Sequence, residues 1–199
     1  MRITRLFLLL PLLLLSCSTP SYVFLNPVEQ TGVDFNEGKW LLNSIDGNSS
    51  VNDMIYKKAV EDFTGFVGNR LSETGTTNGL LLPAKIPLHP SQKQIADLQI
   101  GTKSDYFINI KTEAVKDEMG SVSLSPRSVQ DNRQNVSAVT LEVYDLKNSV
   151  VIYSQTSQGS AQRPDDTAGD VHLVKSSQGL LLGAYNRLIK DIKNKSSVR

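Results

Sequence analysis

Two spacings of apolar residues divide most of this 199-residue chain into short strands and amphipathic helices. Recurrence every three or four positions indicates one face of a helix, and strict alternation indicates a half-buried strand. The pattern predicts strands at 39–45, 80–86, 105–115, 136–146 and 150–161, and helices at 53–72, 91–100 and about 181–192. This order predicts an α+β fold (α/β in the broad sense), a single mixed sheet of about five strands with three packed helices.

Several polar residues and glycines mark the ends of these elements. Asn52 or Asp53 is a candidate cap of the first helix, and Ser91 with Gln94 has the spacing of a capping box for the second. Gly65 and Gly68 lie inside the first predicted helix, where each costs about 1 kcal/mol relative to Ala. We interpret them as places where the helix packs closely on the sheet.

The strongest local signal is a hairpin. Two alternating runs, 136–146 and 150–161, flank a tight turn at 147–149. Polar segments at 116–135 and 163–170 are predicted loops, and residues 18–37 show no sustained period.

The first 16 residues have the features of a secretory signal. Arg2 and Arg5 give a positive start, and an apolar run from Leu6 to Leu15 follows, interrupted only by Pro11. This run is too short for a transmembrane helix, which needs roughly 20 apolar residues.

A lipobox ends this signal, in the order Leu14, Leu15, Ser16 and Cys17. In bacteria such a box directs cleavage before the cysteine, whose thiolate is nucleophilic enough to take a diacylglyceryl group. Further acyl chains, such as palmitate, on the new amino terminus make the attachment effectively permanent. The alternative is an ordinary signal peptide beside a free thiol, but the single cysteine of the chain has no internal disulfide partner, which favours acylation.

These features predict the organisation of the chain: a signal peptide at 1–16, a lipidated Cys17 with a flexible tether at 17–38, and one domain at 39–195. In enteric-type sorting, Ser18 after the cysteine favours the outer membrane over the inner. We therefore expect a lipid-anchored outer-membrane protein whose domain faces the periplasm.

The net charge of the mature chain limits the classes of partner that we expect. Without Arg2 and Arg5, the mature chain has 19 Lys and Arg against 20 Asp and Glu. A protein that gains affinity by neutralising phosphates needs a concentrated basic excess, so we expect no nucleic-acid partner.

Two segments resemble a family of bacterial periplasmic domains. Residues 95–110 read IADLQIGTKSDYFINI, and 139–154 read VTLEVYDLKNSVVIYS. Together with the element order over 39–193, they resemble the domain shared by the curli secretion lipoproteins, the lipoprotein activators of penicillin-binding proteins and the amino-terminal domain of the TolB family. Asp145 is the clearest matching position, where its side chain can cap the following turn.

The chain departs from that family pattern at two points. Lys103 and Ser104 replace the usual glycine before the Ala-Asp-Tyr word, and Ser149 replaces the glycine of the hairpin turn. Pore-forming members add amphipathic hairpins, each strand of which needs about nine to eleven alternating residues. Segment 116–135 carries charges and Pro126, which disfavours such a hairpin.

Candidate catalytic residues are few. His89 lies between prolines in PLHPS and His172 lies in DVHLV, and for both we favour a surface or capping role over a metal site. Asp165, Asp166 and Asp170 lack the spacing and closing Glu of a calcium loop. The GFVG word at 65–68 falls within a predicted helix rather than a phosphate loop. We therefore expect no enzyme activity, no cofactor and no metal.

Three functions remain open at this point. The favoured one is a non-catalytic binding or assembly module for another envelope protein, through a sheet face or the loops at 116–135 and 163–170. The second is an oligomeric component of a secretion or transport system, including an auxiliary lipoprotein of a lipid transporter. The third is a hydrolase with scattered catalytic residues.

Overall fold

The computed structural model describes residues 19–25, 31–45, 51–75, 86–117, 134–162 and 175–197. Within these ranges the strands are β1 (Ser21–Phe24), β2 (Trp40–Leu42), β3 (Leu71–Glu73), β4 (Tyr106–Asp117), β5 (Gln134–Asp145) and β6 (Val150–Gln162). The α-helices are α2 (Asn52–Val67), α3 (Gln92–Thr102) and α4 (Ser177–Lys195), and a 3-10 turn, η2 (Gly68–Arg70), follows α2.

All six strands form one mixed sheet in the order β1-β6-β5-β4-β2-β3. The long strands β4, β5 and β6 pair antiparallel as a meander, and β1 adds antiparallel to β6. β2 lies parallel to both β3 and β4. The predicted fold class, a single mixed sheet with three packed helices, is confirmed, with a strand count close to the five expected.

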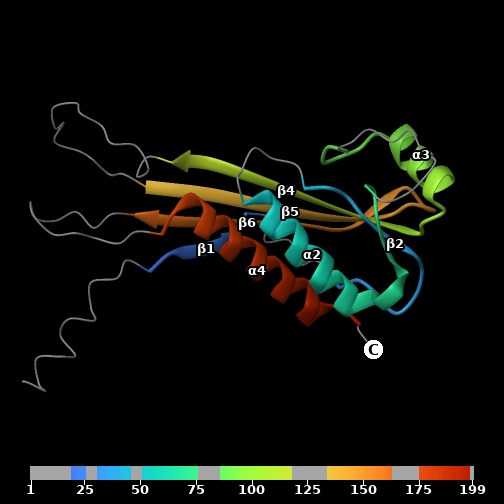
Figure 1. Ribbon diagram of the computed structural model, residues 1–199, viewed down its shortest axis with the longest axis horizontal. Coiled ribbons are helices and arrows are strands. Elements are labelled where there is room, and N and C mark those ends of the chain that lie inside the picture. The colour runs from blue at the N-terminus through green and yellow to red at the C-terminus, as the bar shows by residue number, and fades with distance from the viewer. Residues whose placement is uncertain are drawn as a thin grey trace, which may run out of the picture.

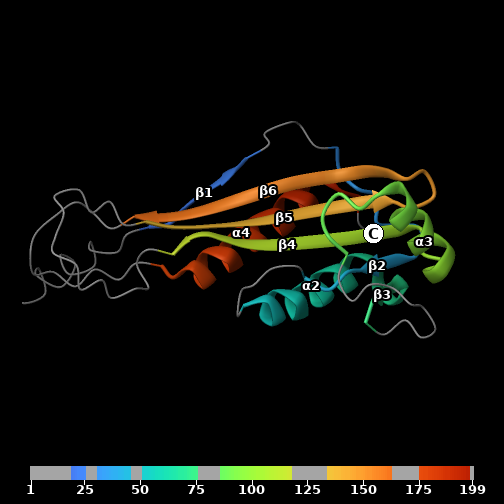
Figure 2. The ribbon, with the colours of Figure 1, turned by 90° about the horizontal axis from the view of Figure 1, so that it is seen from above.

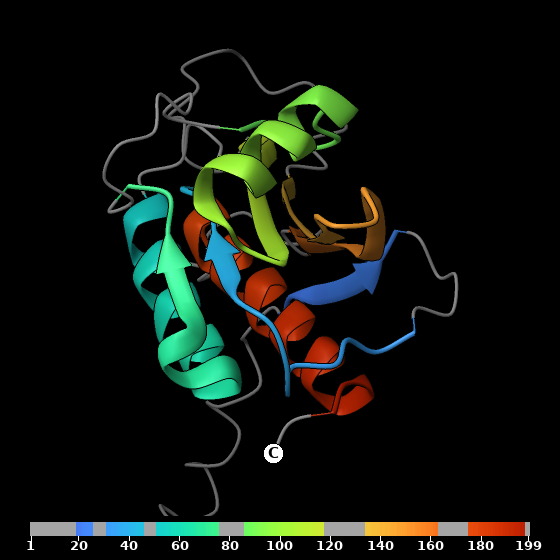
Figure 3. The same cartoon turned by 90° about the vertical axis from the view of Figure 1, so that its right-hand side faces the viewer.

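The main core lies between one face of the sheet and two helices. Figure 1 shows α2 and α4 side by side across this face, and Figure 3 shows the same pair from the end of the molecule. The last helix buries the stripe that its spacing predicted, Leu181, Ala184, Tyr185, Leu188 and Ile192. From the sheet come Trp40, Leu42, Ile108, Ile110, Val139, Leu141, Val143 and Tyr153.

The opposite face of the sheet, which we call the outer face, carries a smaller apolar cluster at one end. There α3 places Ile95 and Leu98 against Phe107 and Tyr144. Figure 2 shows α3 beyond the ends of β2 and β4, away from β1. The predicted capping box is present, because Ser91 accepts from the Gln94 amide while the Gln94 side chain accepts from the Ser91 amide.

The hairpin prediction is also confirmed. β5 and β6 pair over their whole length, with Asp145 opposite Val150. Asp145 caps the turn as expected, accepting from the Asn148 amide at 2.9 Å and from the Asn148 side chain at 2.7 Å.

The first predicted helix is wrong at both ends. Val51, not Asn52 or Asp53, is the amino-terminal cap, and it makes no side-chain capping bond. The helix ends at Val67 because Gly68 has a φ of 64°. After η2 the chain enters β3, whose first two residues fall within the range predicted as helix. The predicted strand at 80–86 lies outside the described residues except for Ile86.

The interpretation of the two helix glycines is also wrong. A Cβ added at Gly65 or Gly68 would meet nothing within 4 Å, so neither glycine marks a close approach of the helix to the sheet.

Part of the predicted tether belongs to the fold. β1 pairs with β6, and Val33 and Phe35 lie in the main core. Arg70 fixes the segment around Phe35 by donating to the carbonyl oxygens of Phe35, at 2.6 Å, and Gly38, at 3.0 Å. The side chains of Tyr22, Phe24 and Phe35 pack on the domain, so these residues of the segment predicted as a tether contribute to its core.

Candidate binding face on the sheet

A row of buried polar side chains crosses the outer face. Strand register places Asn109 of β4 opposite Glu142 of β5, and Glu142 opposite Ser154 of β6. Asn43, which follows β2, continues the row, because its side chain donates to Asn109 Oδ1 at 3.0 Å. Asn43, Asn109 and Glu142 are all 0% exposed. Buried polar groups of this kind require hydrogen-bond partners.

Residues 86–90, which we call the strap, supply those partners from above the sheet. The Asn43 side chain donates to the Ile86 carbonyl at 2.8 Å, and the Asn109 side chain donates to the Pro87 carbonyl at 2.8 Å. The His89 amide donates to Glu142 Oε2 and to the Tyr144 hydroxyl oxygen, both at 3.2 Å. The prolines of the strap have no amide hydrogen to donate to a neighbouring strand. The carbonyl groups of the strap, which would otherwise need a strand partner, accept hydrogen bonds from side chains of the sheet.

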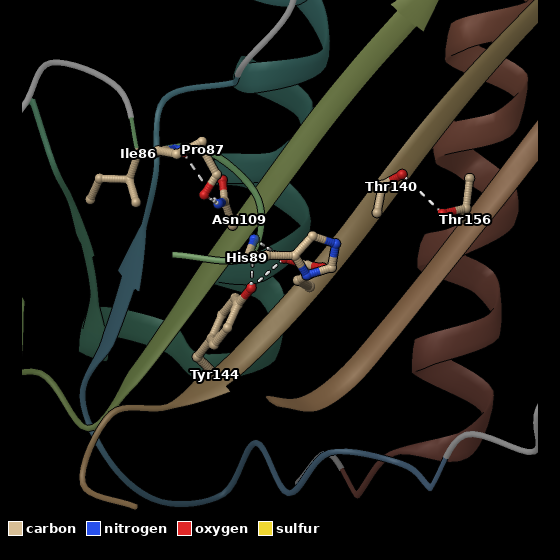
Figure 4. A network of polar contacts seen from close by, with 8 residues as sticks. Ile86, Pro87, His89, Asn109, Thr140, Tyr144 and Thr156 are labelled. Carbon is tan, nitrogen blue, oxygen red and sulfur yellow. Dashed lines mark hydrogen bonds and ion pairs between the residues drawn. The ribbon is translucent and has the colours of Figure 1, made fainter. Parts of the chain in front are cut away.

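Glu142 is the centre of this network. Its carboxylate accepts a hydrogen bond from the Tyr144 hydroxyl, and its Oε1 lies 3.0 Å from His89 Nδ1. Burial, followed by the hydrogen bond to Glu142 and the charge of that carboxylate, raises the pKa of the Tyr144 phenol above its ordinary value. Tyr144 therefore stays protonated and remains a donor. Figure 4 shows its hydroxyl directed at the backbone of His89.

His89 presents its ring to solvent above this carboxylate. Its side chain is 79% exposed while that of Glu142 is 0% exposed. The residue adopts a left-handed backbone conformation, with a φ of 53°. The predicted surface position of His89 is confirmed, and the structure adds its contact with a buried acid. In the part of the chain that the structure describes, no group of three or more His, Cys, Asp or Glu side chains could hold a metal ion.

Small hydroxyl groups extend the polar surface beside the strap. Thr140 of β5 and Thr156 of β6 face each other, with 2.9 Å between their hydroxyl oxygens (Figure 4). Val151, opposite Tyr144 at the start of β6, is 47% exposed. This surface of the sheet therefore presents the His89 imidazole, the hydroxyl groups of Thr140 and Thr156, and the apolar Val151 side chain.

Several residues singled out in the sequence are not part of this face as the structure describes it. Cys17, His172, Asp165, Asp166 and Asp170 lie outside the described residues, as do the polar loops apart from the ends of β4 and β5. Sequence reasoning did not find Glu142 or Tyr144. Glu142 is a charged residue within an otherwise apolar alternating run. On its own, such a residue is interpreted as facing solvent.

No helix in the described ranges has the length and apolar character to cross a membrane.

No protein-family model matches the sequence. No curated protein matches it either.

Solved structures with a similar chain path include the PelC dodecamer from Paraburkholderia phytofirmans, at 10% identity and a TM-score of 0.42, covering 89% of this chain and 96% of that one. Lipoprotein GNA1162 from Neisseria meningitidis matches at 13% identity and a TM-score of 0.41, covering 78% of this chain and 99% of that one. A putative neuraminyllactose-binding hemagglutinin homolog from Helicobacter pylori matches at 15% identity and a TM-score of 0.40, covering 85% of this chain and 88% of that one. The resemblance to the curli secretion, activator and TolB families stays a prediction from sequence.

Proposed function

We propose that this protein is a membrane-anchored envelope lipoprotein that binds another envelope protein without catalysing a reaction. The observation that carries the proposal is the lipobox ending at Cys17, because it accounts for both secretion and attachment. The lipid would hold the domain at the outer membrane, facing the periplasm.

The binding surface in this proposal is the outer face around the strap. Partly buried hydrogen bonds between the strap and the sheet hold the backbone of His89 in place, and Val151 lies on a strand of the same sheet. Preformed surfaces bind with less loss of conformational entropy than mobile ones. The Glu142 carboxylate engages Tyr144 and the strap backbone, which favours a structural role for it over acid-base catalysis.

Anchoring is tested by mass spectrometry of the mature amino terminus, with fractionation of the wild type and of Cys17→Ser. We expect the wild type to begin at an acylated Cys17 and to fractionate with the outer membrane, and the variant to lose the acyl mass. A mature chain that begins elsewhere, or that carries no lipid, contradicts the proposal.

Binding is tested with a photo-crosslinking amino acid at Val151, compared with one at Met54 on α2. These side chains are 47% and 57% exposed, so they differ mainly in which side of the molecule they report. We expect Val151 to capture one envelope protein that Met54 does not, and His89→Ala to reduce that capture. Equal capture from both positions, or none from Val151, contradicts the assignment of this face.

An oligomeric secretion or transport component is the second candidate, and β1 favours it. This strand lies at one edge of the sheet, with Val23 50% exposed and the adjoining Leu25 48% exposed. Edge strands of this kind can pair with another chain. Mass photometry of the acylated protein in detergent separates the candidates, because the oligomer predicts particles of one defined multiple of the chain mass.

A further inference from the structure

We propose that β1 clamps the lipid anchor to one end of the domain, so that the ends of β4 and β6 face the membrane and the β5–β6 turn points away from it. This inference rests on the proposed acylation of Cys17 and adds an orientation to it. The membrane-facing surface, which we call the anchor end, comprises Asp117, Gln134, Gln162 and the start of α4.

Only a short length of chain separates the anchor from the sheet. Cys17 and Ser21 are four residues apart, which limits their separation to about 14 Å even in a fully extended chain. β6 has 13 residues and is therefore about 43 Å long. The anchor can reach the end of the sheet at which β1 begins, and it cannot reach the other end.

β1 runs antiparallel to β6 and starts near the carboxyl end of that strand. Ser21 pairs with Ser160 and Phe24 pairs with Ser157, so the chain enters β1 beside the last residues of β6. Figure 1 shows β1 beginning toward the end of the molecule where β4 and β6 finish, whereas α3 and the β5–β6 turn lie at the other end. The start of α4 belongs to the anchor end as well, because Ser137 donates to the Ser177 carbonyl at 3.1 Å.

Tyr22 fixes β1 to the domain. Its ring occupies a slot between two glycines, Gly159 of β6 and Gly183 of α4. A Cβ at Gly183 would overlap the Tyr22 hydroxyl oxygen, and one at Gly159 would lie 2.7 Å from the Tyr22 ring. Only glycine leaves room for the ring at these two positions.

Further contacts fix both ends of the strand. The hydroxyl oxygens of Ser21 and Ser160 are 2.8 Å apart, and the Leu25 amide donates to the Thr156 carbonyl at 3.0 Å. The Arg187 guanidinium lies 4.7 Å from the centre of the Phe24 ring, over its face. β1 is therefore held by contacts with both β6 and α4.

The inference is tested with the acylated protein in phosphatidylethanolamine–phosphatidylglycerol vesicles that contain a headgroup-labelled quencher lipid. A fluorophore is attached to Lys116→Cys, at the end of β4, or to Lys147→Cys, in the β5–β6 turn. Both lysines are exposed. We expect quenching at position 116 to exceed that at 147 several-fold. Equal quenching, or stronger quenching at 147, overturns the orientation.

Two variants test the clamp itself. Gly183→Ala should expel the Tyr22 ring and reduce the difference between the two labels, while Gly65→Ala, another helix glycine but with open space around it, should preserve the difference. An insertion of eight Gly and Ser residues between Ser18 and Thr19 should abolish the difference in quenching without changing the fold. This variant tests the clamp if Gly183→Ala does not fold. A difference that survives the insertion overturns the clamp.

Failure of the proposed acylation gives a separate result. In that case the labelled protein does not float with the vesicles at all, whichever position carries the label. Flotation with equal quenching therefore contradicts only the orientation.

Discussion

Lys103 and Ser149, at which the sequence departs from the family pattern that it resembles, both have a left-handed backbone conformation. Lys103 ends α3 with a φ of 52°, and Ser149 closes the β5–β6 turn with a φ of 55°. The resembling family has glycine at these places. Glycine adopts such a conformation without steric cost, whereas other residues lose roughly 1–2 kcal/mol there. Lys103 and Ser149 therefore hold a backbone conformation that suits glycine better than either residue.

Ser149→Gly should therefore raise the free energy of unfolding by about 0.5–1 kcal/mol, the relief of strain less the entropy that glycine adds to the unfolded chain. Urea unfolding followed by circular dichroism measures the change. Lys147→Gly is the matched control, because residue 147 is in the same turn without a positive φ, and it should leave stability unchanged or lower it. Stabilisation by both variants would point to a general effect of the turn and not to strain at Ser149.

Glu142 should contribute to stability through its hydrogen bonds to Tyr144 and to the strap. Glu142→Ala removes the acceptor of the Tyr144 hydroxyl and of the His89 amide and leaves a cavity, which should cost about 2–4 kcal/mol. Hydrogen exchange at the His89 amide should accelerate in the same variant, because the strap loses its hold on the sheet. Glu113→Ala, on the same face but exposed, should change stability by less than about 0.5 kcal/mol. Unchanged exchange at His89 would contradict the role of Glu142 in fixing the strap.

Among the elements, those with long repeated patterns could be predicted from sequence and the short ones could not. β5 and α4 carry many apolar positions at one spacing, so a single exception does not hide them, and β6 could be predicted from the tight turn that joins it to β5. β1 and β3 have four and three residues, too few for a period, and their existence depends on partners distant in the chain. β1 pairs with residues of β6 that follow it by more than 130 positions.

The candidate binding face was missed for a related reason. Asn43, Asn109 and Glu142 are polar residues in or beside strands, and alternation assigns polar strand residues to solvent. Their burial depends on the strap, which crosses the sheet at a place that no local pattern specifies. His89 could be singled out from its neighbouring prolines, but its partner could not.

The two glycines near the end of α2, Gly65 and Gly68, should respond to substitution by alanine in opposite directions. Both leave open space where an alanine would place its Cβ, but only Gly68 has a positive φ. Gly65→Ala should stabilise the protein by up to about 1 kcal/mol through helix propensity, and Gly68→Ala should destabilise it by about 1 kcal/mol. Thermal unfolding of the two variants beside the wild type measures this. Changes of the same sign would show that φ does not distinguish the positions.

For the molecule as a whole, hydrogen bonds from tyrosine to carboxylate join its layers. Tyr153 of β6 donates to Asp191 of α4 at 3.0 Å, and Tyr185 of α4 donates to Asp62 of α2 at 2.9 Å. Tyr56 of α2 donates to Glu73 of β3 at 2.6 Å, which completes the path from the sheet through both helices and back to the sheet.

These contacts predict a loss of stability in alkali. Burial, followed by the nearby carboxylate and the hydrogen bond to it, raises the pKa of both Tyr153 and Tyr185. The unfolded chain loses these protons near pH 10, while the native protein keeps them, so the native state binds more protons above that pH. The free energy of unfolding must then fall as pH rises through 10 and beyond, and the contribution is fully present below pH 10.

Each tyrosine that stays protonated contributes a slope of up to about 1.4 kcal/mol per pH unit above pH 10. Tyr185→Phe removes one such group, so its stability should fall less steeply with pH than that of the wild type, even if the variant is less stable at neutral pH. Urea unfolding at a series of pH values from 8 to about 11 gives both slopes, and the absorbance of tyrosinate reports when the phenols ionise. Parallel slopes would mean that Tyr185 ionises alike in the folded and unfolded chain, which is incompatible with its burial against Asp62.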